Sequence, residues 1–553
     1  MEVASRAQYT SGSYFDSWRR LTSKKRVAKS EGFARKVLGY RSRNTRLNMI
    51  SAENGDVCLE QLKSSMESDA TEKAMSKKCE GQLSSVKANS CSSYKGANRT
   101  TEMAQEDNNL CWNNLPSIIL QEIFSYLPYN CRLRASQVCR NWRYALFHPH
   151  FWKKITFVLR DKDSISWTRY LADSFGLSVQ EVTIFCDIPN YYAKETLALL
   201  KKLKYNRHLR KLYFESSSST FEYEDSEKYT TALVLSLIKI FKTADRLETL
   251  SLGCIEDLTT SADVILLNLR KYQAKHLTTL SLASVRDDPD DYIFFKFTSA
   301  FMFKSFVRLS ILTLDYEFVS NSLLRALNNG TMERLVIHVH CWYDQYSGTT
   351  DSAWRVFVQK NPKCELRLTL IHSYVGIEII DTHILRPSMP LTHLKVLFCE
   401  NVNIRALHRL SMWYSHSLKS LIWIDSMEPS ARNIPATYDP SDPDSPDPLV
   451  LVAWKCTKLV EIVFIGHKYH QENLLAIARL RGCSLKSLVF AQRYIASDDE
   501  SWHKAETITH EIQEIMGRRW EPLSDADLPA VVKDPFGGDS REVIMPLVLR
   551  DQK

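Results

Sequence analysis

The sequence repeats one short pattern, L-x-x-L-x-L with other aliphatic residues allowed, ten times between residues 179 and 490. Alternating apolar residues are what a short strand requires when one of its faces is buried. The copies start 23 to 41 residues apart, except for one interval of 59 residues that holds a weaker copy over 365–370. Such a recurring unit predicts a solenoid, in which each strand is covered by the repeats on both sides. The copies start at Val179, Leu209, Leu247, Leu277, Leu309, Met332, Leu391, Leu418, Leu459 and Leu485.

Segments with helical spacing of apolar residues separate the strand patterns, at 193–203, 231–241, 264–272, 323–327, 354–358, 407–413 and 474–480. Strand, turn and helix in succession predict an α/β solenoid over 158–490, with a parallel sheet on its concave face. Two of the longest intervals contain loop compositions, at 216–220 and 435–448, which we expect to lie in loops. Residues 491–553, which include the apolar segment 543–549, are expected to cap the last repeat.

A different pattern occupies residues 115–152, ahead of the repeats. Pro116 suits the first turn of a helix, and apolar residues from Ile119 to Leu127 follow at helical spacing until Pro128 ends the helix. Two shorter helices are predicted over 133–138 and 141–147. Three helices in fewer than about 40 residues make too small a core to bury all of these side chains. We therefore expect a partner protein to cover part of this surface.

Residues 111–157 resemble an F-box, the module by which substrate receptors dock onto a Skp-type adaptor of a cullin-RING ubiquitin ligase. The resemblance rests on Leu-Pro at 115–116, the apolar run 119–127, Val-Cys-Arg at 138–140 with Trp142, and Phe-Trp at 151–152. Ile118 departs from the family, which often has an acidic residue there. The resemblance implies adaptor contacts by Leu115, Pro116, Ile119, Leu120, Ile123, Phe124, Leu127, Val138, Cys139 and Trp142.

The repeats resemble the degenerate leucine-rich repeats found downstream of many F-boxes, although only Cys399 clearly matches the family's Asn or Cys after the strand. Together the two resemblances imply a non-catalytic substrate-recognition subunit of an SCF-type (Skp, cullin, F-box) ubiquitin ligase. The sequence does not identify the protein substrate. Residues between the strand leucines are candidates for the concave face, namely Tyr213, Thr249, Thr279, Thr313, Arg334, Lys395 and Ser420.

The net charge of +8 belongs to the N-terminal tail, because residues 1–46 carry twelve Lys and Arg against three acidic residues. Residues 1–108, a basic tail followed by a polar linker, are expected to be disordered, since the linker in particular holds too few apolar groups for a core. The cluster Lys24, Lys25 and Arg26 predicts either a nuclear signal, a nucleic-acid patch or a solvated basic tail. Two alternative functions follow, a leucine-rich-repeat interaction scaffold and a nucleic-acid-associated protein that acts through this tail.

The sequence contains no phosphate-binding loop, nucleophile elbow or H-E-x-x-H motif, so we do not expect an enzyme or a cofactor. His338 and His340, with Cys341 beside them, are the one metal-like cluster, but histidines on a strand are more often structural, and no metal is expected. Thirteen scattered cysteines argue against a disulfide framework and favour the cytoplasm, the nucleus or both. No apolar run is long enough to span a bilayer, so no membrane partner is expected.

Overall fold

The computed structural model describes residues 112–186, 189–217, 226–286, 300–340, 348–426, 437, 445–496 and 505–552. These residues all belong to one compact unit. The predicted disordered tail and linker at 1–108 therefore lie outside the described residues. None of the helices in the described ranges has the length and hydropathy that a membrane crossing requires.

Three short helices open the described chain, α3 (Ser117–Tyr126), α4 (Tyr129–Ser136) and α5 (Arg140–Leu146). Pro116 and Pro128 lie directly before α3 and α4, where a missing N–H leaves no helical hydrogen bond unmade. Phe124 is fully buried and packs edge-on against Trp142, with the ring centroids 5.9 Å apart. A 3-10 turn at Pro149–Trp152 ends this segment, and Trp152 stacks on Phe175 of the next helix.

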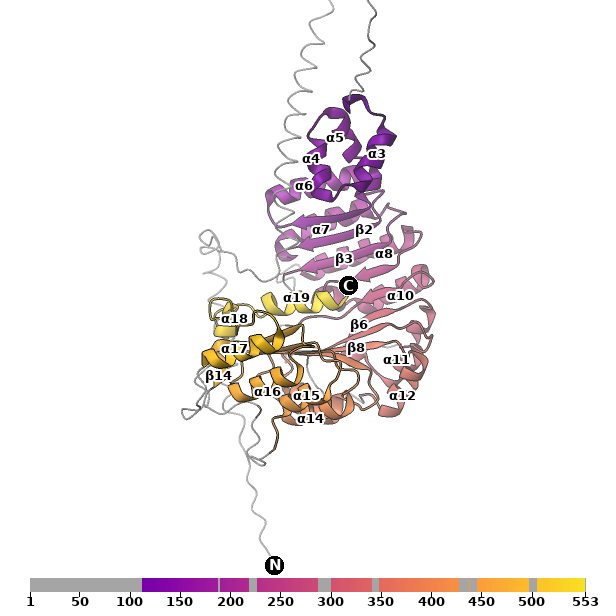
Figure 1. The fold of residues 1–553 in the computed structure, drawn as a ribbon. Coiled ribbons are helices and arrows are strands. Elements are labelled where there is room, and N and C mark those ends of the chain that lie inside the picture. Colours follow the sequence, from indigo (N-terminus) through magenta and orange to yellow (C-terminus); the bar gives the residue numbers. More distant parts are fainter. Residues whose placement is uncertain are drawn as a thin grey trace, which may run out of the picture. The chain divides into compact units, whose positions relative to one another are not determined.

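A sheet of twelve parallel strands follows, in which the strands lie in sequence order apart from β12. The predicted α/β solenoid with a parallel sheet is thus confirmed, and each predicted strand, including the weaker copy at 365–370, lies in it (Figure 1). The sequence pattern did not identify the first strand, which spans the predicted boundary at residue 157 between the F-box and the repeats. The strands are β1 (Lys154–Leu159), β2 (Glu181–Cys186), β3 (Lys211–Ser216), β4 (Thr249–Ser251), β5 (Thr279–Ser281), β6 (Ile311–Asp315), β7 (Arg334–Val339), β8 (Glu365–Ile371), β9 (Leu391–Leu397), β10 (Ser420–Ile424), β11 (Glu461–Ile465) and β13 (Ser487–Phe490).

Helices connect most consecutive strands and pack on one another in chain order. Between sheet and helices, leucines at equivalent register positions form a continuous buried row that includes Leu212, Leu250, Leu280, Leu312 and Leu335. The larger connecting helices are α6 (Lys162–Phe175), α7 (Pro189–Leu203), α8 (Ser226–Thr243), α10 (Ala262–Gln273), α11 (Asn321–Ala326), α12 (Asp351–Lys360), α13 (Tyr374–Ile379), α14 (Ile404–Trp413), α15 (Pro448–Lys455) and α16 (Gln471–Arg481). A small second sheet joins β12 (Tyr469–His470) to β14 (Ile495–Ala496).

Buried amide side chains tie several repeats to the repeat before them. Asn206 donates to the carbonyls of Gly176 and Val179. Gln273 donates in the same way to Phe241 and Ala244, and Asn361 to Leu327. Each amide oxygen accepts a backbone N–H just ahead of a strand. Because the bonds satisfy carbonyls at helix ends, they fix how successive repeats stack.

The segment 435–448, predicted to be a loop, lies mostly outside the described residues, which include Thr437 and residues 445–448 of it. Asp447 caps α15 by accepting the N–H groups of Leu449 and Val450, and it also accepts the hydroxyl of Tyr469 at 2.9 Å. Thr437 is buried and donates to the same carboxylate. Thr437 and Asp447 are therefore both part of the folded repeat.

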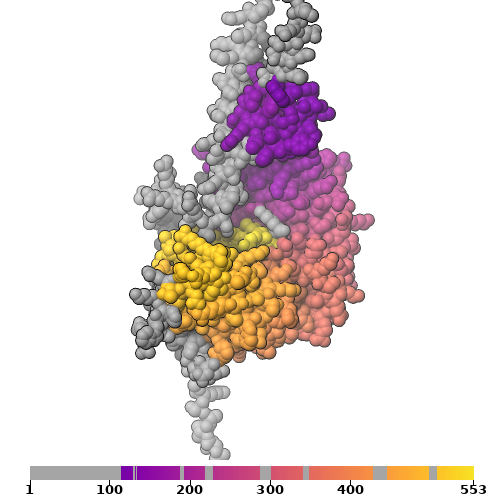
Figure 2. Space-filling model, in the orientation of Figure 1, coloured from indigo at the N-terminus to yellow at the C-terminus, as the bar shows by residue number. Residues whose placement is uncertain are grey.

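The C-terminal residues contain α17 (Ala505–Met516), α18 (Ala530–Lys533) and α19 (Arg541–Gln552). Helix α17 packs beside α16, and Trp520 donates its indole N–H to Leu488 of β13 at 2.7 Å, at the end of the sheet where a cap was expected. Helix α19 instead returns to contact β6 and β8 (Figure 1). Figure 2 shows the yellow C-terminal residues reaching from the orange repeats toward the magenta ones.

Candidate functional site

The residues predicted to bind an adaptor divide into two groups by their burial. Leu120 and Phe124 are fully buried and hold the three helices together, so in this conformation they are not available to a partner. Pro116, Ile119 and Val138 are exposed. Five predicted contacts are partly exposed, namely Leu115, Ile123, Leu127, Cys139 and Trp142.

The same helices expose large apolar and aromatic side chains that the sequence reasoning did not select. Ile118 is 71% exposed, Tyr126 is 78% exposed, and Tyr144 is also largely exposed, as is Trp112 in the 3-10 turn Trp112–Asn114 just before α3. Ile118 was visible in the sequence as an apolar residue in place of an acidic one. Groups of exposed apolar residues on a small helical module are typical of a protein–protein interface.

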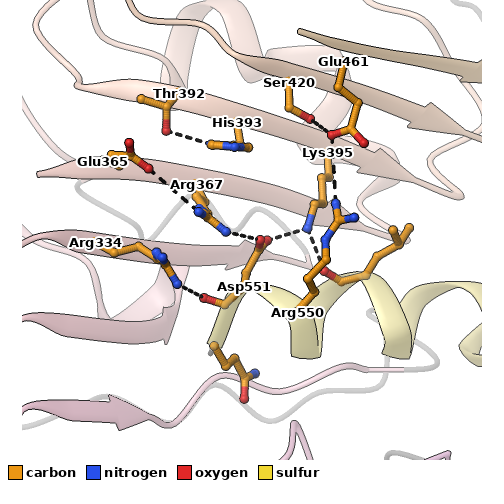
Figure 3. Close-up of polar contacts among 12 residues, drawn as sticks. Arg334, Glu365, Arg367, Thr392, His393, Lys395, Ser420, Glu461, Arg550 and Asp551 are labelled. Atoms are coloured by element: carbon orange, nitrogen blue, oxygen red, sulfur yellow. Dashed lines mark hydrogen bonds and ion pairs between the residues drawn. The ribbon is translucent and has the colours of Figure 1, made fainter. Parts of the chain in front are cut away.

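The second candidate region is the inner face, which we define as the sheet side bearing Arg334, Arg367 and Lys395. Arg367 lies between the buried Leu366 and Leu368 of β8, so its side chain points away from the leucine core. The three basic side chains converge on Asp551 of α19 (Figure 3). Arg367 Nη1 lies 2.7 Å from Asp551 Oδ1 and Lys395 Nζ lies 2.5 Å from Oδ2. Arg334 donates to the Asp551 carbonyl at 3.1 Å.

Burial and charge act in opposite directions on this group. Burial raises the pKa of Asp551, but the charges and hydrogen bonds of Lys395 and Arg367 outweigh it, so its pKa lies below the usual value. Burial lowers the pKa of Lys395 despite the neighbouring carboxylate. Lys395 is only 1% exposed and also donates to the carbonyl of Leu547 at 2.7 Å. A buried carboxylate with two cationic partners stays ionised at neutral pH.

Helix α19 covers much of the face that was predicted to be concave and open. Of the candidate residues on it, Thr249, Thr313, Lys395 and Ser420 are buried, while Tyr213, Thr279 and Arg334 are partly exposed. Ile544, Met545 and Val548 of α19 are buried, and Gln552 accepts the Ser251 hydroxyl at 2.7 Å. No local sequence pattern indicates this arrangement, because the contacts join residues 156 and 301 positions apart.

Comparison with known proteins finds relatives both of the N-terminal helices and of the chain as a whole. Residues 112–158 match the F-box-like family. The chain contains an F-box-like domain. F-box only protein 33 of Mus musculus is 24% identical over 488 residues, which are 76% of this chain and 84% of that protein. F-box/LRR-repeat protein 21 of Bos taurus is 22% identical over 75% of this chain and 90% of that protein. The chain, with its F-box-like domain followed by the repeat region, is thus homologous to F-box only protein 33 and F-box/LRR-repeat protein 21 over about three quarters of its length.

In the repeat region, the two histidines that were candidate metal ligands lie close to a buried carboxylate. His338, His340 and Asp315 offer ligand atoms within 4.8 Å of one another, and all three are buried. However, Arg286 forms an ion pair with the same carboxylate, Nη2 to Oδ2 at 3.7 Å, and a second with Glu317. A metal ion on Asp315 would be repelled by this guanidinium. We therefore interpret the group as a buried ion-pair network; Cys341 lies outside the described residues.

Buried histidines predict a loss of stability in mild acid. Burial lowers the pKa of both His338 and His372 to about 4, against an ordinary value near 6.5. Between about pH 4 and 6.5 the unfolded chain therefore binds protons that the folded chain does not, and stability falls as pH falls. The expected slope is up to about 1.4 kcal/mol per pH unit for each histidine. Melting temperatures between pH 7.5 and 5 measure it.

Two variants separate this effect from general acid sensitivity. His338→Gln is expected to reduce the slope of melting temperature against pH, because it removes one of the protons taken up on unfolding. His510→Gln changes a histidine whose side chain is 73% exposed and should leave the slope as it is. Equal slopes in both variants would show that buried His338 is not neutral in the folded state.

Proposed function

We propose that this chain is the substrate-recognition subunit of an SCF-type ubiquitin ligase, in which the F-box-like domain docks a Skp-type adaptor and the repeat region holds a protein substrate. The observation that carries the proposal is the exposed apolar surface of α3 to α5, which includes Ile118, Ile119, Tyr126 and Val138. An adaptor that covers these side chains removes apolar area from water, at about 25 cal/mol per Å².

A receptor of this kind acts without a catalytic residue of its own. The cullin-RING partner brings a charged ubiquitin-conjugating enzyme, and the receptor raises the effective concentration of substrate lysines beside it. To keep the substrate lysines beside that enzyme, the receptor needs a rigid connection between its adaptor-binding and substrate-binding parts. Stacking of Trp152 and Phe147 on Phe175 of α6 gives the F-box-like domain such a connection to the repeats.

Placing charge on the exposed surface is expected to abolish adaptor binding while the protein stays folded. Ile119→Asp combined with Val138→Asp should weaken binding at least about thirtyfold, because central apolar residues of an interface commonly contribute 2 kcal/mol or more. Co-purification and titration with a purified Skp-type adaptor measure this. Leu267→Asp, at an exposed leucine of α10, is the matched control and should bind normally.

The same titration decides between the proposed receptor and a leucine-rich-repeat scaffold that uses its N-terminal helices for another partner. If the wild-type chain does not bind the adaptor, or if a chain lacking residues 113–152 still binds it, the receptor proposal fails. A scaffold would then account better for the repeat region.

We further propose that the protein divides between cytoplasm and nucleus, with the basic cluster at Lys24, Lys25 and Arg26 as the nuclear signal. Changing the three residues to alanine is expected to move the nuclear pool into the cytoplasm in fluorescence imaging. An unchanged distribution would mean that the cluster is a solvated basic tail. Salt-dependent binding of a peptide of residues 1–46 to nucleic acid tests the third function, which we do not favour.

A further inference from the structure

Helix α19 is held on the inner face by its own side chains and by hydrogen bonds from Lys395 and Arg334 to two of its backbone carbonyls. It follows the last strand of the main sheet, and among the described residues its departure would break no backbone hydrogen bond between strands. Its contacts come from one helical face, on which Ile544, Met545, Val548 and Asp551 recur at spacings of three and four. This part of the sheet therefore binds a helix whose apolar face ends in a carboxylate.

The sheet supplies the opposite charges. Arg334, Arg367 and Lys395 come from the adjacent strands β7, β8 and β9, and a single carboxylate on α19 serves Arg367 and Lys395 (Figure 3). Lys395 is almost fully buried, so a helix without an acidic group in this place would leave its charge unpaired. Lys395 and Arg367 thus select for an anionic group at a fixed point along a helix, and Arg334 adds a hydrogen bond to the helix backbone.

Helix α19 is an incomplete fit to the face that it covers. The hydroxyls of Ser281, Thr313 and Thr369 lie on inner-face positions of β5, β6 and β8, are at most 2% exposed, and have no hydrogen-bond partner in the protein. Each unsatisfied buried hydroxyl is unfavourable. Pro546 lies inside the helix, where it removes one backbone hydrogen bond and weakens the helical conformation. Another helix could satisfy the same cations and these hydroxyls as well.

We infer that the inner face of β5 to β9 is a binding site for an acidic amphipathic helix, and that α19 is its intramolecular occupant. The inference rests on the proposed function in one respect: if the chain is a substrate receptor, the helix that competes with α19 belongs to the substrate. The ligand carries apolar residues three and six or seven positions before a carboxylate, as Val548, Met545 and Ile544 precede Asp551. Polar groups that reach Thr313 and Thr369 favour it over α19.

A cleavable chain tests the site with the whole protein present. A protease recognition sequence is inserted between Phe536 and Gly537, both of which are exposed. After cleavage, α19 is held only by its contacts with the inner face. A fluorescent peptide of residues 540–553 should then exchange into the cleaved protein, as measured by anisotropy. The intact protein should bind it at least about tenfold more weakly, because its own tethered helix competes at high effective concentration.

Two peptide variants test recognition of the carboxylate. Asp551→Asn in the peptide should weaken binding at least about thirtyfold, because it removes the partner of a buried cation. Glu542→Gln makes the same change at an exposed residue of the helix and should bind like the unaltered peptide. Equal affinities for the two variants would overturn recognition of an anion.

Two further outcomes would also overturn the inference. If no exchange occurs after cleavage, or if the cleaved protein loses its circular-dichroism signal, α19 is a permanent part of the core. Adaptor binding is measured on the same samples. A chain that exchanges the peptide but does not bind the adaptor would contradict the proposed function and leave the inner-face site intact.

Discussion

Replacing Asp551 with alanine is expected to lower the free energy of unfolding by about 3–5 kcal/mol, because it leaves Lys395 buried without its carboxylate. Arg367 also loses one carboxylate partner, but it is less buried and keeps Glu365 at 3.8 Å. A domain is commonly stable by only about 5–15 kcal/mol, so the loss should appear as a large drop in the urea midpoint.

A pair of controls distinguishes the buried charge from loss of packing. Asp551→Leu together with Lys395→Met replaces both charges by apolar groups and should recover most of the lost stability, since a buried ion pair is often no better than such a replacement. Asp173→Ala breaks an exposed ion pair with Lys202 and should change stability by less than about 1 kcal/mol. If the double variant is as unstable as Asp551→Ala, packing and not charge explains the effect.

Leu280→Ala is the second variant with a large expected effect. Leu280 is fully buried in β5, in register with Leu250 and Leu312 on the neighbouring strands. The cavity left in this row should cost about 2–5 kcal/mol. Leu267→Ala, at a leucine of α10 in the same repeat that is 56% exposed, should stay within about 0.5 kcal/mol of wild type. Denaturant melts compare the two variants, and equal stabilities would contradict the strand assignment at this repeat.

The sequence was enough to place the repeat strands, because alternation and register act locally. A strand such as β5, with only three residues, is recognisable because its leucine falls at the same point of the pattern as Leu250 and Leu312. Strand β1 also alternates, with Ile155, Phe157 and Leu159 buried, but Trp152 stands where the other copies begin with an aliphatic residue, and the predicted boundary at residue 157 divides the strand. The amide bridges of Asn206 and Gln273 escaped notice because a single amide at a turn has no periodic signature.

The functional regions were less predictable, for two physical reasons. Apolar residue types alone do not show which side of a small helix is buried, so fully buried Leu120 and exposed Ile119 were given the same role. Long-range contacts leave no local pattern, so Lys395 was expected on an open face although Asp551 covers it. Asp551 is plain in the sequence, but no pattern around it indicates that it pairs with Lys395, 156 positions earlier.

The return of α19 also sets the order in which the protein is completed during synthesis. Adjacent strands such as β7 and β8 can pair as soon as the second of them leaves the ribosome. The 156 residues between Lys395 and Asp551 take about 8–30 s to translate at about 5–20 residues per second. Throughout that interval Arg367 and Lys395 are made but lack the carboxylate of Asp551. Each newly made molecule therefore passes through a stage in which this surface is open to any acidic helix, including one from a chaperone or a substrate already nearby.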